Sequence, residues 1–129
     1  MNLSVNGNPS NTGGFNLDRP KVVGEWKISD PSPDRWFNTG AFVRNDPFTF
    51  GNAGRNILES PGTIKFDLAL HKNFQPTEKM RVQFRAEAFN AFNHPIFDGP
   101  NHQVGNRNLG VISNAAPGRI MQMGLKVIF

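Results

Sequence analysis

Residues that perform catalysis or bind metals occur throughout this sequence, but their spacing matches no catalytic or metal site. The three histidines, His71, His94 and His102, do not share one element, so they predict no metal site. Serine, histidine and aspartate are all present, yet no serine lies in a G-x-S-x-G or comparable context. The absence of cysteine excludes thiolate chemistry and Cys-based metal sites. We therefore expect neither an enzyme nor a bound cofactor.

Two polar patterns have a simpler structural interpretation. Arg85 and Glu87 are two residues apart, which on a strand places them on one face as a charge pair or network rather than as an acid and a base. The run "GNAGRN" at Gly51 to Asn56 resembles a phosphate-binding loop but lacks its Lys-Ser/Thr ending and a preceding strand. We interpret it as a turn-rich loop.

Composition narrows the class of protein further. With 37% hydrophobic and 19% charged residues, the 129-residue chain is neither disordered nor helical within a membrane. The net charge is +4, but the basic residues are scattered and form no stripe, so no nucleic acid is expected as a partner. The amino terminus lacks the features of a signal peptide, so any export signal is expected outside this chain.

Turn-forming pairs such as Asn8-Pro9, Asp46-Pro47 and Pro61-Gly62 divide residues 1–62 at short intervals. The aromatic residues there follow no sustained period. This pattern predicts a long loop-rich segment whose aromatic side chains pack locally, with a binding surface as the alternative.

After Gly62 the sequence alternates between apolar and polar residues, which is typical of strands. Strands are predicted at about 63–74, 79–92 and 119–129, with a short break at Gln75–Glu78. Helix-favouring residues occur in the second segment, but its strict alternation favours a strand. The fold class is therefore all-β, an antiparallel three-stranded meander with long loops.

The lengths of the connections suggest the last strands of a transmembrane β-barrel, because such barrels alternate short periplasmic turns with long extracellular loops. The break at Gln75–Glu78 is short, whereas 1–62 and 93–118 are long. On this interpretation 1–62 is extracellular and 63–129 forms the barrel strands. Residues expected to face the lumen are Lys65, Asp67, Arg81, Arg85, Glu87 and Lys126. Apolar residues on the other face (Ile64, Phe66, Phe84, Leu125 and Val127) are expected to face lipid, with no charge among them.

The closing octapeptide "QMGLKVIF" resembles the carboxyl-terminal signal by which the barrel-assembly machinery recognises outer-membrane proteins. Its polar, glycine, apolar and aromatic positions are Gln122, Gly124, Val127 and Phe129. An edge strand with unpaired N–H and C=O groups can pair transiently with another edge. The resemblance implies that this strand binds the barrel-assembly machinery.

A second resemblance covers about Arg19 to Phe129. The runs "WFNTGAFV", "TFGNAGRNILESPG", "FDLALHKNF" and "RVQFRAEAFNAFNHPIF" are similar, in that order, to the last strands of TonB-dependent receptor-like transporters with a carboxypeptidase-regulatory-like domain. The resemblance implies a 22-stranded barrel with an internal plug in the bacterial outer membrane. It also implies uptake of a bulky ligand, driven by an inner-membrane energy-coupling complex.

The plug, the energy-coupling segment and most of the barrel are missing from this sequence, so we expect a carboxyl-terminal part that cannot transport alone. Its expected partners are outer-membrane lipid, the rest of the barrel and plug, and the TonB-type energy-coupling complex, which the missing amino-terminal part would contact. The absence of tyrosine departs from the aromatic girdles usual in such barrels.

Two further expectations concern the loops and the alternative fold. In "FNAFNHP", Asn90 and Asn93 are expected to satisfy backbone groups where the strand ends, and Asn93 and His94 are candidate ligand contacts because extracellular loops recognise ligands. The alternative is a small soluble extracellular binding module, adhesin-like or carbohydrate-binding, whose apolar strand faces form a core.

Overall fold

The computed structural model describes all residues, 1–129, and divides them into two compact units. The loop unit comprises residues 1–61 and 97–115, and the strand unit comprises residues 62–96 and 116–129. Segment 97–115, which the sequence-based division groups with the strands, is therefore part of the loop unit. The structure contains no helix of the length and hydrophobicity that a membrane crossing requires.

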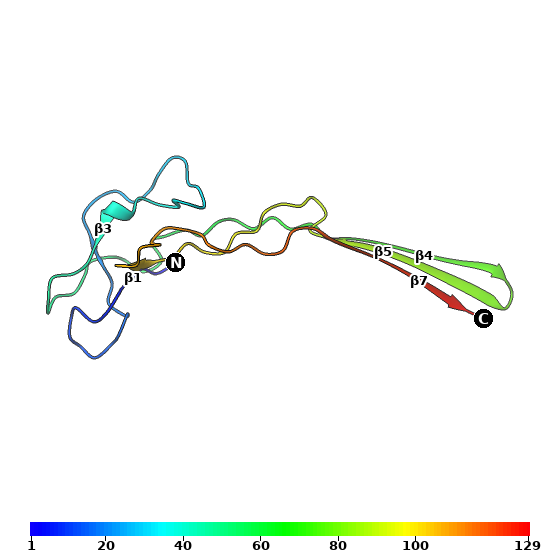
Figure 1. The fold of residues 1–129 in the computed structure, drawn as a ribbon, viewed down its shortest axis with the longest axis horizontal. Helices are drawn as coiled ribbons and strands as arrows, with labels where there is room; N and C mark the ends of the chain where they lie inside the picture. Colours follow the sequence, from blue (N-terminus) through cyan, green and yellow to red (C-terminus); the bar gives the residue numbers. More distant parts are fainter. The chain divides into compact units, whose positions relative to one another are not determined.

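The strand unit is a three-stranded antiparallel sheet in the order β4-β5-β7. Its strands are β4 at Leu68–Thr77, β5 at Met80–Phe89 and β7 at Ile120–Ile128 (Figure 1). This sheet confirms the predicted all-β fold and the antiparallel three-stranded meander. The outer edges of β4 and β7 have no partner strand, so the sheet is open rather than closed into a barrel.

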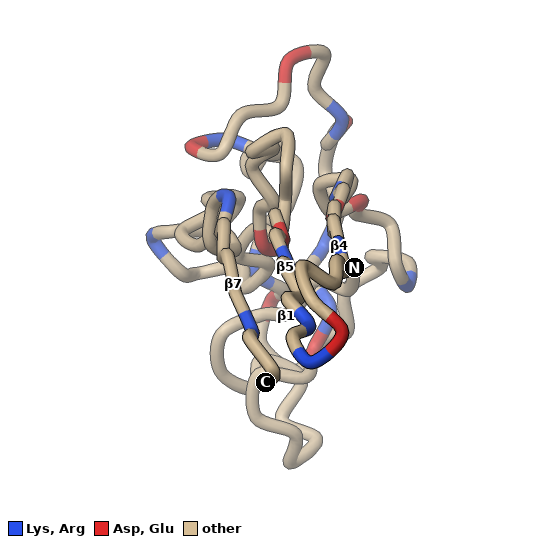
Figure 2. Tube along the Cα trace, turned by 90° about the vertical axis from the view of Figure 1, so that its right-hand side faces the viewer, with Lys and Arg blue, Asp and Glu red and all other residues tan.

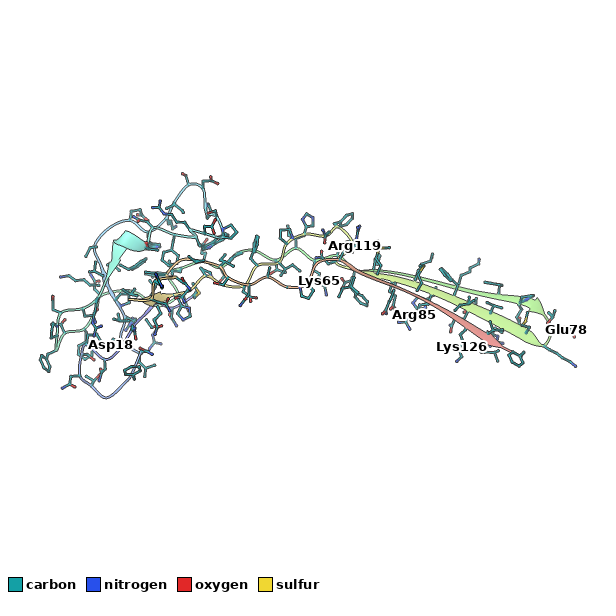
Figure 3. All side chains as sticks on the ribbon, in the orientation of Figure 1. Asp18, Lys65, Glu78, Arg85, Arg119 and Lys126 are labelled. Carbon is teal, nitrogen blue, oxygen red and sulfur yellow. The ribbon has the colours of Figure 1, made fainter.

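The predicted bounds 63–74 are wrong at both ends: β4 begins only at Leu68, and residues 75–77 of the predicted break belong to the strand. Pro76 lies within β4, where a β-bulge between Phe74 and Thr77 interrupts the register. Proline is tolerated there because β4 is an edge strand and its missing N–H leaves no ladder bond unmade. The chain turns at Glu78 and Lys79, at the tip of the hairpin (Figure 3).

At its other end the hairpin stops at Asn90, earlier than the predicted end of the second strand at residue 92. Asn90 has a φ of +51°, outside the strand region, so the β5 ladder ends at Phe89. The backbone N–H of Asn90 donates to the Asp67 carboxylate at 2.8 Å instead of to a strand partner. The next N–H, of Ala91, donates to the Phe66 carbonyl at 2.7 Å.

The register separates the sheet into two faces, because directly paired residues point to the same side. One of the two middle rows of the apolar face joins Leu70, Ala86 and Met123, and the next row, on the polar face, joins His71, Arg85 and Gly124. One charge breaks this separation. Lys72 pairs with Phe84 and so belongs to the apolar face, where the sequence predicted no charge.

The loop unit has a small core of its own. Strand β1 (Ser4–Val5) pairs in parallel with β6 (Gln103–Val104), and β2 (Lys21–Val22) pairs antiparallel with β3 (Phe42–Val43), which follows the short 3-10 helix η1 (Thr39–Ala41). Its buried core residues are Leu3, Val5, Phe37, Ala41, Phe42, Leu58 and Val104, with Trp26 and Trp36 packed against them. Trp26, Trp36, Phe37 and Phe42 therefore pack locally, as predicted, whereas Phe15, Phe48 and Phe50 are exposed.

The "GNAGRN" run is a structural loop that lies against the segment before β2. The N–H of Ala53 donates to the Pro20 carbonyl at 3.0 Å, and the Asn52 side chain accepts the Val22 N–H at 2.7 Å. Gly51 allows this approach, since a Cβ built on it would lie 2.0 Å from the Arg19 carbonyl oxygen. The run thus packs against the backbone of the segment before β2.

Substituting Gly51→Ala should destabilise the loop unit by roughly 3 kcal/mol, because the added methyl group forces two backbone segments apart. Faster hydrogen exchange of the Ala53 amide would report this change. Gly62→Ala is the matched control, because a Cβ there meets nothing within 4 Å. Equal exchange of the Ala53 amide in both variants would contradict the proposed close packing.

Candidate membrane and assembly surfaces

The apolar face of the strand unit is open along its whole length. Its side chains on the outer strands are exposed, to 63% for Leu70 and 80% for Met123. No layer of the strand unit covers this face, so an apolar environment is required to remove it from water.

The polar face contains a hydrogen-bonded network at its centre. Arg85 and Glu87 form an ion pair along β5, and the Gln122 side chain on β7 donates to the same carboxylate. Glu87 is only 9% exposed although it lies on an open sheet face. The predicted charge pair is therefore present, and Gln122 extends it to the neighbouring strand.

The other residues predicted to face the lumen lie around this network. Lys65 forms an ion pair with Asp67, 3.1 Å apart, just before β4. The register places Arg81 and Lys126 on the polar face, opposite Ile128 and Gln83 respectively. Arg85 and Lys126 point to the same side of the sheet (Figure 3). That this face lines a lumen stays a prediction.

Strand β7 contains three of the four residues of the predicted assembly signal, and the fourth follows it directly. Gln122 and Gly124 belong to the polar face, opposite Glu87 and Arg85, whereas Val127 belongs to the apolar face. Phe129 follows the end of the strand and is 98% exposed. Because β5 lies between β4 and β7 (Figure 2), one edge of β7 remains free to pair.

The "FNAFNHP" run is a turn fixed by its asparagines. The Asn90 side chain donates to the His94 carbonyl at 2.9 Å and accepts the His94 N–H at 3.1 Å. The Asn93 side chain accepts the Arg119 N–H at 2.9 Å, which joins this turn to the start of β7. The His94 ring lies 6.4 Å from the Phe92 ring. A ligand contact by Asn93 or His94 stays a prediction.

Comparison with known families decides the class of this protein. The family model described as "Outer membrane beta barrel domain" matches residues 1–122. The chain belongs to this family. The chain, called the barrel domain below, is therefore located in the bacterial outer membrane. The match ends at Gln122, so the last residues of the predicted assembly signal lie beyond it. Comparisons with curated proteins and with solved structures gave no match.

Aromatic residues lie near both ends of the sheet in the barrel domain. The Phe66 and Phe92 rings lie 5.3 Å apart beside the long loops, and Phe74 lies near the β4–β5 turn. At about 3.4 Å per residue, β4 at Leu68–Thr77 extends about 31 Å, or roughly 23 Å of bilayer height at a 40° tilt. This height fits the apolar band of about 25 Å found on outer-membrane barrels.

Lys72 is the charged residue that sequence reasoning did not place on the apolar face of the barrel domain. In "LALHKNF" it has the same parity as Leu70 and Phe74, so counting alternate residues through β4 would have placed it on the apolar face. Because Lys72 lies within a run of three polar residues, His71, Lys72 and Asn73, its alternation with Leu70 and Phe74 is easily missed.

Substituting Asn90→Ala should destabilise the barrel domain by about 2 kcal/mol, because two side-chain hydrogen bonds and a residue suited to positive φ are lost together. A lower urea midpoint of the protein in lipid vesicles would measure the effect. Asn11→Ala is the matched control, since Asn11 has a φ of +56° but no side-chain hydrogen bond. Equal losses in both variants would assign the effect to backbone strain alone.

Proposed function

We propose that the barrel domain forms the last strands of a TonB-dependent receptor-like transporter that takes up a bulky ligand. These strands do not transport alone. The plug and the segment that contacts the energy-coupling complex belong to other parts of the transporter.

The observation that supports this proposal best is the two-faced sheet with a free β7 edge. Its apolar face suits lipid, and its polar face, with the network of Arg85, Glu87 and Gln122, suits a hydrated or plugged lumen. A soluble extracellular module is the weaker candidate, because the chain belongs to an outer-membrane family and no layer of the strand unit covers the apolar face.

Orientation follows from the connections. In the proposed barrel the two-residue turn at Glu78 and Lys79 lies in the periplasm, and the loop unit lies on the extracellular side. Asn93 and His94 would then lie at the extracellular end of the strand unit, where ligand recognition takes place. The free edge of β7 would pair first with the barrel-assembly machinery and finally with another strand of the same barrel.

Uptake by living cells tests the transport function. One strain of the source organism lacks the gene that encodes these strands, and a second lacks the energy-coupling complex. Mass spectrometry of the spent medium should find at least one bulky compound left behind by both strains and consumed after the intact gene is restored. Consumption of every compound by the first strain at the normal rate would contradict the proposal.

A further inference from the structure

The loop unit contains a surface hollow lined by three basic side chains. Arg19 lies just before β2, Arg55 lies in the "GNAGRN" run, and His102 lies just before β6. The hollow has a volume of about 510 Å³, in the range of pockets that bind small ligands. No acidic residue lines it, and Asp98 lines a neighbouring hollow. Its charge therefore suits an anion.

The amino-terminal segment brings two of these side chains together from distant parts of the sequence. The Ser4 N–H donates to the His102 carbonyl at 3.1 Å, which continues the pairing of β1 with β6. The Asn2 side chain accepts the N–H of Asn56, the residue after Arg55, at 2.8 Å. Arg55 and His102 are thus held beside the same short segment of the chain.

The third basic side chain, that of Arg19, is held by its own hydrogen bond. Its Nη1 donates to the Ala53 carbonyl at 3.1 Å, two residues before Arg55. A guanidinium has five N–H donors, so most of those of Arg19 remain available to a ligand. Neither arginine forms an ion pair, and the Asp18 carboxylate accepts hydrogen bonds from Ser10 instead, at 2.8 Å. Both guanidinium groups therefore lack a counter-charge within the chain.

We propose that this hollow binds a sugar phosphate, with the phosphate held by Arg19 and Arg55. Arginine binds two phosphate oxygens through parallel hydrogen bonds, and two arginines balance the charge of nearly two on a phosphate monoester. The His102 ring supplies a further N–H donor. The site requires only the loop unit and does not depend on the proposed transport.

The rest of the lining suits the sugar. The side-chain oxygens of Asn2 and Asn16 accept backbone N–H groups, at 2.8 and 2.6 Å, so their amide nitrogens remain available as donors. The Ser4 hydroxyl lies in the same lining, and Leu3 and Leu17 suit the C–H groups of a sugar ring. Amide and hydroxyl groups bind sugar hydroxyls, whereas a lipid chain requires a continuous apolar surface. The lining therefore favours a sugar phosphate over a lipid phosphate.

Isothermal titration calorimetry of the full barrel in uncharged detergent micelles tests the site. Glucose 6-phosphate is the probe, and glucose and glucuronate are the comparisons with no charge and with one charge. Phosphatidate in the same micelles represents a phosphate monoester from a lipid. We expect glucose 6-phosphate to bind about tenfold more tightly than glucuronate, because the phosphate makes at least one more charge-assisted hydrogen bond. Added salt should weaken its binding.

Variants separate the hollow from the overall positive charge. Arg55→Gln should weaken binding of glucose 6-phosphate about tenfold, and Arg19→Lys, which keeps the charge, should weaken it less. Arg35→Gln is the control and should leave binding unchanged, because Arg35 is an exposed residue of the loop unit that does not line the hollow.

Three results would overturn this site. They are absence of glucose 6-phosphate binding, equal binding by the Arg55→Gln and Arg35→Gln variants, and binding of phosphatidate in its place. The last result would assign the phosphate to a membrane lipid. All three would leave the transport proposal intact, because the uptake experiment tests transport separately.

Discussion

An arginine in place of Leu70 should prevent stable insertion of the barrel domain, whereas an arginine in place of the adjacent His71 should be tolerated. Leu70 lies in one of the two middle rows of the apolar face, with Ala86 and Met123. A guanidinium at the middle of the bilayer costs about 2–4 kcal/mol. Lys72 lies one row away on the same face, so repulsion between the two cations adds to this cost.

The His71→Arg variant makes this comparison sharp, because it adds the same side chain at nearly the same depth but on the polar face. The measurement is the folded fraction of each variant in outer-membrane preparations and its urea midpoint in lipid vesicles. Equal folding of the two variants would show that the apolar face does not contact lipid. Loss of the His71→Arg variant alone would reverse the assignment of the two faces.

Substituting Phe129→Ser should reduce the amount of assembled barrel about tenfold, a loss of about 1.4 kcal/mol in binding to the assembly machinery. Val127 lies on the apolar face of β7, and Phe129 has the same parity and is exposed, so both are available to a partner that pairs with the free edge. Removing the larger of the two apolar side chains weakens that contact without changing any contact inside the sheet.

Ile128→Ser is the control, because Ile128 lies on the polar face opposite Arg81. Pulse-chase labelling, followed by gel electrophoresis with and without heating, separates assembled from unassembled protein. Normal assembly of Phe129→Ser, or an equal defect in both variants, would contradict a signal formed by alternate residues of β7.

Much of the strand unit could be predicted because alternation is a local property. The strict alternation around Phe84 and Arg85 identifies β5 and its two faces, and the same parity rule places Glu87 beside Arg85. The ends of strands were harder to predict. Pro76 resembles a strand break, yet an edge strand tolerates it, and the end of β5 depends on the conformation of Asn90.

The loop unit could not be predicted in detail because its order depends on contacts between distant residues. A two-residue strand such as β1 shows no periodicity, and its partner Val104 is far away in the sequence. The close approach of Gly51 to Arg19 could not be predicted either, since nothing in "GNAGRN" indicates which segment it contacts.

The pairing of β1 with β6 also constrains the order of folding. Val5 cannot be buried against Val104 until the chain between them has been synthesised, and that chain includes the whole β4–β5 hairpin. The hairpin can form first, because its turn is local and hairpins close within microseconds. Once formed, its hydrogen bond from Ala91 to Phe66 brings residues far apart in the sequence together, which lowers the entropy cost of closing the loop unit. Early formation of the hairpin should therefore speed the folding of the loop unit. Damage to the hairpin should slow the folding of loops that lie outside it.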